Sequence, residues 1–99
     1  MLRKTVLTNK QKVKVTFEMP PECRAKTVTL VGDFNGWDKT ATPMNKRKKD
    51  NVFATSLTLA AGRTYQFRYW LDGSRWENDW SADDYVPNGY GEDNSVVKT

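Results

Sequence analysis

The chain has 99 residues, a length typical of one domain with a single small core. Its 16 Lys/Arg outnumber 12 Asp/Glu, and the absence of His excludes the usual general base, metal ligand and His-activated nucleophile. Cys23 is the sole cysteine, which excludes an internal disulfide and favours a reducing compartment. We therefore expect one domain spanning residues 1–99, with residues 1–10 as a candidate flexible segment.

No apolar run reaches membrane-spanning length, and the first fifteen residues lack the apolar segment of a secretory signal. We therefore expect a soluble, cytoplasmic protein. Residues 1–50 carry 12 Lys/Arg against 5 Asp/Glu, whereas residues 51–99 carry 4 against 7. A basic half suits an anionic partner, but Lys12 and Lys14 alternate with apolar residues as exposed strand positions do.

Period-two alternation of apolar and polar residues runs through most of the chain. It predicts strands at residues 12–17, 27–31, 52–59, 64–71 and 94–99. The core-facing aromatic positions on these strands are Phe17, Phe53, Tyr65, Phe67 and Tyr69. Along residues 64–71, the opposite face carries Gln66, Arg68 and Trp70.

Glycine and proline turns separate these runs, and no segment shows a convincing helical period. The turns are Pro20-Pro21, Asn35-Gly36, Ala61-Gly62, Asp72-Gly73 and Asn88-Gly89. About seven short strands with regular turns predict an all-β fold, an immunoglobulin-like antiparallel β-sandwich. The Cys…Trp…Cys pattern of antibody domains is missing, so the likeness is one of architecture.

The four tryptophans fall on the outer strand face, in loops or beside charges: Trp37, Trp70, Trp76 and Trp80. A flat exposed indole suits the C–H face of a pyranose ring, while polar side chains reach the hydroxyls at its rim. We expect Trp37 and Trp76, each just after a glycine turn, to be stacking platforms that face water. Arg68 and Asn94 are the candidate polar clamps, and the alternative is that the indoles cover the ends of the sandwich.

Nucleic acid is a rival partner, because aromatic and basic side chains together bind single strands. The run Lys46–Lys49 is the candidate phosphate contact, yet it is remote in sequence from the Trp-rich half, whose acidic charge would repel phosphates. A solvated loop is the alternative for this run. We therefore expect no nucleic-acid or membrane partner.

The acidic stretch at residues 77–85 raises two possible functions, calcium binding and glycoside hydrolysis, and both are disfavoured. This stretch, "ENDWSADDY", lacks the alternating ligands and central glycine of an EF-hand loop. A sandwich of this size also offers no evident pocket that would raise the pKa of a proton-donating carboxyl for glycoside hydrolysis. We expect no metal, no cofactor and no catalytic residue.

Two stretches, "VTLVGDFNGWDKTATPM" and "YQFRYWLDGSRWENDWSADDYVPNGYGEDNSVV", carry a family resemblance. Their motifs G-x-F-N-x-W, Y-x-F-x-Y-x-x-D-G-x-x-W and G-x-x-N-S, in this order, resemble the isoamylase N-terminal (early-set) family. This is carbohydrate-binding module family 48, which includes the glycogen-binding domain of the AMP-activated kinase β subunit. The resemblance covers residues 11–99 and implies an immunoglobulin-like sandwich that binds α-1,4-linked glucans such as glycogen, amylose or maltooligosaccharides.

The resemblance also implies roles for individual residues. Trp37 and Trp76 match the two stacking tryptophans of kinase-type members, Arg68 matches a basic strand residue, and Asn94 matches an asparagine near the last strand. Tyr90 stands where a hydrophobic residue reaches through the sugar ring. Trp70 is a further candidate on the outer strand face.

Tyr90, Glu92 and Asp79-Trp80 depart from the family pattern. Tyr90 replaces the hydrophobic residue that reaches through the sugar ring, and Glu92 replaces a small hydroxyl residue. Asp79-Trp80 replaces an Asp-Pro pair, which would set Trp80 beside Trp76. In many amylase-type members the domain packs on a catalytic barrel without clear sugar binding. The sequence thus favours a non-catalytic α-glucan-binding module that targets a partner to the polymer. The alternative is a structural or protein-docking module of an α-glucan enzyme or kinase, with no sugar binding of its own.

Overall fold

The structure is a computed structural model that describes residues 2–7 and 11–99. Within these residues the chain forms nine strands and two 3-10 helices. The strands are β1 (Leu2–Val6), β2 (Lys12–Met19), β3 (Val28–Gly32), β4 (Asn45–Lys46), β5 (Phe53–Ala60), β6 (Thr64–Leu71), β7 (Arg75–Glu77), β8 (Asp84–Pro87) and β9 (Asp93–Lys98). The helices are η1 (Pro21–Cys23) and η2 (Asp33–Asn35).

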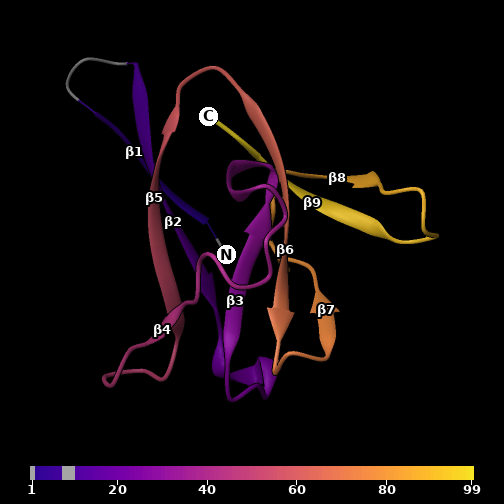
Figure 1. The fold of residues 1–99 in the computed structure, drawn as a ribbon. Coiled ribbons are helices and arrows are strands. Elements are labelled where there is room, and N and C mark those ends of the chain that lie inside the picture. The colour runs from indigo at the N-terminus through magenta and orange to yellow at the C-terminus, as the bar shows by residue number, and fades with distance from the viewer. Residues whose placement is uncertain (1, 8–10) are drawn as a thin grey trace.

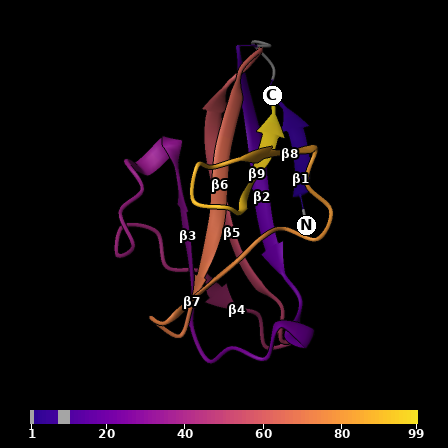
Figure 2. The same cartoon turned by 90° about the vertical axis from the view of Figure 1, so that its right-hand side faces the viewer.

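Two antiparallel sheets form the two layers of the molecule (Figure 1). The first sheet has the strand order β1-β2-β5-β4, and the second has β3-β6-β9-β8 with β7 paired to β6. Figure 2 turns the second sheet toward the viewer, and the connection between β8 and β9 lies in front of it. The predicted all-β, immunoglobulin-like sandwich is confirmed.

The core between the sheets is built from the apolar faces that the alternation predicted. Phe67 makes edge contacts with Phe17 and Tyr69, at 5.1 and 5.7 Å between ring centroids. These three rings and Phe53 are buried, as expected. Tyr65 is only half-buried and packs against the border of this core.

The register of β6 places its other face on the outside of the second sheet. Phe67 pairs with Gly32 of β3 and with Ser95 of β9, so Arg68 points to the opposite face. Gly32 is required here because a Cβ at this position would lie 2.8 Å from the Cβ of Phe67 and 2.6 Å from the carbonyl oxygen of Gln66. The tight β3–β6 pairing therefore explains the first residue of the G-x-F-N-x-W motif.

Part of the N-terminal segment is an edge strand. Leu2–Val6 pairs with β2 along its whole length, and the Lys4 ammonium forms an ion pair with Asp83 near the start of β8. Four of its five residues are exposed, which is why the sequence shows no amphipathic signal there. Residue 1 and residues 8–10, which belong to the candidate flexible segment, lie outside the described residues.

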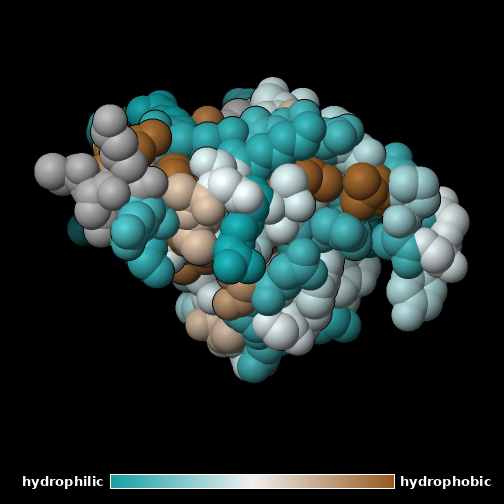
Figure 3. Space-filling view, turned by 90° about the horizontal axis from the view of Figure 1, so that it is seen from above, coloured by the Kyte–Doolittle hydropathy of each residue, from teal (hydrophilic) through white to brown (hydrophobic). Residues whose placement is uncertain are grey.

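The surface seen from above is mostly hydrophilic, and hydrophobic residues show only in small separate groups (Figure 3). This distribution agrees with the burial of the large aliphatic side chains between the sheets. Among residues 2–7 and 11–99, no helix has the length and hydrophobicity needed to cross a membrane.

Candidate functional site

The outer face of the second sheet carries a hollow of about 200 Å³. Its lining residues are Trp37, Arg68, Trp76, Asn88, Tyr90 and Asn94. Five of the six site residues predicted from the sequence therefore lie around one hollow, although they come from four separate segments of the chain. Three aromatic rings and three nitrogen-bearing polar side chains give it the composition of a site for a polar molecule with an apolar face.

The first aromatic platform is set by the loop after β3. The Asn35 amide accepts a hydrogen bond from the Gly32 N–H at 3.0 Å and donates one to the Leu30 carbonyl at 2.9 Å, which closes η2. Gly36 and Trp37 follow with φ of 66° and 59°. Positive φ is uncommon for a bulky residue and marks a position whose conformation the surrounding structure imposes.

Asp33 then fixes the indole of Trp37 to the second sheet. The indole Nε1–H donates to Asp33 Oδ1 at 2.9 Å, and the Gln66 N–H of β6 donates to Asp33 Oδ2 at 2.7 Å. One carboxylate thus joins the loop, the strand and the aromatic ring. The half-buried Trp37 is held in place before any ligand arrives, which lowers the entropic cost of binding.

The second platform is set by the β6–β7 hairpin. Asp72 and Gly73 have φ of 55° and 67°, and the Ser74 N–H closes the turn on the Leu71 carbonyl. Asp72 Oδ1 also accepts hydrogen bonds from the N–H groups of Thr27 and Lys26, which lower the pKa of Asp72 below its ordinary value. The turn is therefore anchored to the segment that leads into β3.

Trp76 on β7 is paired across the hairpin with Trp70 on β6, and their ring centroids lie 4.6 Å apart. The Lys39 ammonium lies 4.1 Å from the centroid of Trp70. Trp70 is not among the residues that line the hollow within the described part of the chain. Trp70 lies beside Trp76 on the same outer face, because cross-strand neighbours share a face, and its part in a binding site stays a prediction.

Arg68 lies beneath the hollow. It points outward from the sheet, as expected, but only 7% of it is exposed. Its Nη2 donates to Glu92 Oε2 at 3.0 Å, and its Cζ lies 5.4 Å from the centroid of the Trp76 ring. The buried Nε–H has no hydrogen-bond partner among residues 2–7 and 11–99. A buried unpaired donor is costly unless a ligand or water accepts from it.

Two asparagines complete the polar side. The Asn94 amide donates to Gln66 Oε1 at 3.0 Å, and Asn88 Nδ2 donates to Asn94 Oδ1 at 3.3 Å. Asn88 was not predicted as a site residue, because the sequence indicates only that it is the first residue of a turn. The sole signal was its place in the Asn88-Gly89 turn ahead of the G-x-x-N-S motif.

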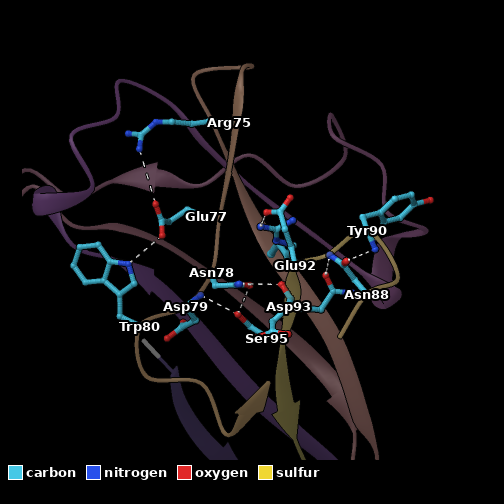
Figure 4. A network of polar contacts seen from close by, with 12 residues as sticks. Arg75, Glu77, Asn78, Asp79, Trp80, Asn88, Tyr90, Glu92, Asp93 and Ser95 are labelled. Atoms are coloured by element: carbon cyan, nitrogen blue, oxygen red, sulfur yellow. Dashed lines mark hydrogen bonds and ion pairs between the residues drawn. The ribbon is translucent and has the colours of Figure 1, made fainter. Parts of the chain in front are cut away.

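Tyr90 is the most exposed residue of the lining, at 88%. Its N–H donates to Asn88 Oδ1 at 2.9 Å, and its ring points away from the polar network (Figure 4). The ring is therefore attached through its backbone to a residue of the hollow, while its side chain reaches into solvent. This geometry leaves the ring free to adjust to a ligand.

Trp80 lies outside the hollow. It is 47% exposed, and its Nε1–H donates to Glu77 Oε1 at 3.4 Å. In Figure 4 Trp80 and Tyr90 lie at opposite ends of the network, and Trp80 is absent from the residues that line the hollow in the described chain. The idea that Trp80 extends the Trp76 platform is not supported by this arrangement.

The segment that separates Trp76 from Trp80 is fixed by buried polar contacts. The Tyr69 hydroxyl donates to Asp79 Oδ2 at 2.7 Å, and the Asp79 N–H donates to Ser95 Oγ at 2.9 Å. Burial, then the charge of Asp79, raise the pKa of Tyr69 well above its ordinary value. Asp79 is thus a structural carboxylate that holds the segment leading to Trp80 against β6 and β9.

A second hollow, of about 240 Å³, lies on the first sheet. Its lining residues are Arg3, Glu18, Pro20, Arg47, Asp50 and Val52. The buried Glu18 carboxylate is 2.9 Å from Arg3 Nε and 2.8 Å from Arg47 Nη2, and Arg47 also binds Asp50. The Lys46–Lys49 run is therefore mixed: Arg47 belongs to an ion-pair network, whereas its lysines are exposed.

Metal binding and thiol chemistry find little support in the described residues. Within residues 2–7 and 11–99, no group of three or more Cys, Asp and Glu side chains is arranged to hold a metal ion. Cys23, the sole cysteine of the sequence, is buried and unpaired. The hollow on the second sheet thus remains the feature whose composition best suits a ligand.

Comparison with known proteins identifies one family. The model of carbohydrate-binding module 48 (isoamylase N-terminal domain) matches residues 22–86, which include the loop of Trp37 and the hairpin of Trp76. A search of curated proteins found no match. The matched segment ends before Asn88, so the last part of the hollow lies beyond it.

Proposed function

The chain belongs to the carbohydrate-binding module 48 (isoamylase N-terminal domain) family, and from this membership we propose that it binds α-1,4-linked glucans of the glycogen or starch type. The hollow on the second sheet would hold the sugar, with Trp37 and Trp76 stacked on successive glucose rings. The protein would not cleave the polymer; it would bring a partner to it, such as an α-glucan enzyme or a kinase.

The observation that carries this proposal is the meeting of two indoles and a buried guanidinium at one hollow. Trp37 and Trp76 line it together with Arg68, whose guanidinium is buried beneath the two rings. The pyranose C–H face fits an aromatic ring, and a sugar hydroxyl is an acceptor for a guanidinium. The amides of Asn88 and Asn94 add donors and acceptors for further hydroxyls.

The composition of the hollow also favours binding over hydrolysis. Besides the polar atoms of its aromatic side chains, its lining carries one guanidinium and two amides, whereas glycoside hydrolysis uses a pair of carboxyl groups across the scissile bond. A helical α-linked chain can wrap around platforms that come from separate loops, whereas a flat β-linked ribbon requires a coplanar strip. We therefore expect selectivity for α-linked over β-linked glucans.

The test is titration calorimetry with maltoheptaose and with cellohexaose. The wild-type protein should bind maltoheptaose weakly and give no heat with cellohexaose. Trp37→Ala and Trp76→Ala should each weaken maltoheptaose binding by about 1–3 kcal/mol, the value of an aromatic stack, which is roughly 5- to 150-fold. Trp80→Ala is the matched control, because it removes an indole outside the hollow and should leave affinity unchanged.

Stability must be measured on the same variants. Trp76→Ala should also cost about 0.5–1.5 kcal/mol of folding free energy, because its ring packs on Trp70, and it should still fold. Equal binding of cellohexaose and maltoheptaose, or equal loss in Trp80→Ala, would contradict the proposal.

A second candidate function is protein docking without sugar binding. The observation that favours it is Trp80, an exposed indole outside the hollow and the kind of side chain that anchors protein interfaces. Its indole is restrained by Glu77, which in turn lies 3.9 Å from Arg75. A retained wild-type fold with no glucan binding, together with loss of an α-glucan enzyme or kinase partner in Trp80→Ala, would favour this function.

A further inference from the structure

The charge balance of the sugar hollow rests on two residues. Arg68 is the charged member of the lining, and 92% of its side chain is buried. An arginine in a water-poor, aromatic surrounding is by itself a strong site for phosphate, because its planar fork matches phosphate oxygens. The protein as a whole is also positively charged, at +4, which draws anions toward it.

Glu92 places a negative charge beside this arginine. Its Oε2 accepts from Arg68 Nη2 at 3.0 Å, while 56% of its own side chain stays exposed at the edge of the hollow. The Glu92 backbone is fixed as well, since its carbonyl accepts the Asn88 N–H at 2.9 Å. The carboxylate is therefore held beside the hollow by two contacts, one from its side chain and one from its main chain.

The arrangement treats neutral and anionic ligands differently. A neutral sugar carries no charge that competes for Arg68, so it can lie against the rings and amides of the hollow without disturbing the Arg68–Glu92 ion pair. A phosphate ester near Arg68 would meet the Glu92 carboxylate, and either the like charges repel or the ion pair breaks. Like charges set against one another are a common source of specificity in binding sites.

We propose that Glu92 is the specificity-determining residue that restricts this hollow to uncharged stretches of α-glucan and excludes those carrying phosphate esters. The inference rests on the proposed function, because it concerns selection among α-glucans at the same site. It assigns a role to Glu92, one of the residues at which the chain departs from the family pattern. Glu92 acts through Arg68 and through its own charge, and is not required to contact a neutral sugar.

The experiment compares maltoheptaose with maltoheptaose carrying a single 6-phosphate, at constant ionic strength. The variants are Glu92→Gln, which keeps an acceptor for Arg68 but removes the charge, and Glu92→Asp, which keeps the charge. Asp93→Asn is the matched control, since it removes one negative charge at the neighbouring exposed position. Thermal melting of each variant verifies that the fold is retained.

The expected result is a change in the preference for the neutral over the phosphorylated sugar, with little change in affinity for maltoheptaose. The wild type should bind the phosphorylated sugar at least about tenfold more weakly than the neutral one. Glu92→Gln should bind maltoheptaose within about twofold of wild type and should recover most of the tenfold loss of affinity for the phosphorylated sugar. Glu92→Asp and Asp93→Asn should prefer the neutral sugar as strongly as the wild type does.

The outcomes separate the two proposals. If the wild type binds maltoheptaose but Glu92→Gln leaves the selectivity unchanged, or Asp93→Asn changes it equally, the role of Glu92 is overturned and glucan binding stands. If the wild type binds the phosphorylated sugar as well as or better than the neutral one, the role of Glu92 is overturned. If it binds neither sugar, both the proposed function and the role of Glu92 are overturned.

Discussion

The two hollows lie on opposite sheets, and each contains a buried charge paired with more exposed partners. On the second sheet the buried member is Arg68, and its neighbours are aromatic rings and amides. On the first sheet the buried member is Glu18, held by two arginines whose side chains are 73% and 30% exposed. Asp50 balances one of these arginines in turn.

The difference shows what distinguishes a binding site from a structural ion-pair network. Around Glu18 the charges satisfy one another, because Arg3 and Arg47 approach one oxygen each. Around Arg68 the ion pair with Glu92 lies beside flat apolar rings and two amides that line the hollow. Size does not separate the two hollows, which have similar volumes. Aromatic planes beside amide groups favour ligand binding, whereas mutual neutralisation of charges favours stability.

The largest expected effect comes from the core that supports both hollows. Phe67→Ala should lower the free energy of unfolding by about 3–5 kcal/mol, because it removes a fully buried ring between two aromatic neighbours. Both hollows would be affected together. The measurement is urea unfolding. The matched control is Tyr90→Ala, an exposed ring whose removal should change stability by only about 0.5 kcal/mol.

A smaller loss of stability is expected from a change in the hollow of the first sheet, with no effect on the hollow of the second. Glu18→Ala removes a buried carboxylate that accepts charge-assisted contacts from two arginines, and should cost about 1–3 kcal/mol of stability. Maltoheptaose affinity should remain as in the wild type. Glu22→Ala, at an exposed position, is the control. A loss of glucan affinity in Glu18→Ala would show that the two hollows are coupled.

Acid should also weaken the network of the first sheet. The hydrogen bond from the Val52 N–H lowers the pKa of Asp50 most, and the Arg47 guanidinium lowers it further. Burial opposes them with a smaller effect than that of Val52, so the pKa lies below its ordinary value of 3.8. Because the folded pKa is the lower one, the stabilisation is present above the unfolded pKa and is lost as pH falls through the folded value. NMR titration should therefore give an Asp50 midpoint below 3.8. A midpoint above 3.8 would contradict this geometry.

The smallest effect is expected from the exposed lysines. Neutral sugars release no counterions, so maltoheptaose affinity should change by less than about twofold between 50 and 200 mM salt, unlike nucleic-acid binding. Replacing Lys46, Lys48 and Lys49 with Ser should likewise leave it unchanged, provided that Arg47 is kept for its contact with Glu18. A steep fall with salt would favour an anionic ligand instead.

The sequence by itself determined the five strands β2, β3, β5, β6 and β9 and the turns that carry Trp37 and Trp76. Strict alternation along residues 64–71 fixes which side chains face the core, since successive side chains of a strand point to opposite faces. The Asn35-Gly36 and Asp72-Gly73 turns are likewise local, because residues that tolerate positive φ define them. Strand β7, with three residues, is too short for a period to show, and β1 has too little buried surface.

The tertiary structure decided which side chains meet. Trp70 and Trp80 match the same pattern of exposed indoles as Trp37 and Trp76. Among the described residues, however, neither lines the hollow: Trp70 lies beside Trp76, and Trp80 contacts Glu77. Asn88 enters the hollow because the β8–β9 pairing folds its turn back over β6. The burial of Arg68 and its contact with Glu92, 24 residues later in the chain, depend on the same pairing. Contacts between distant segments follow from sheet register and loop path, which local periodicity does not contain.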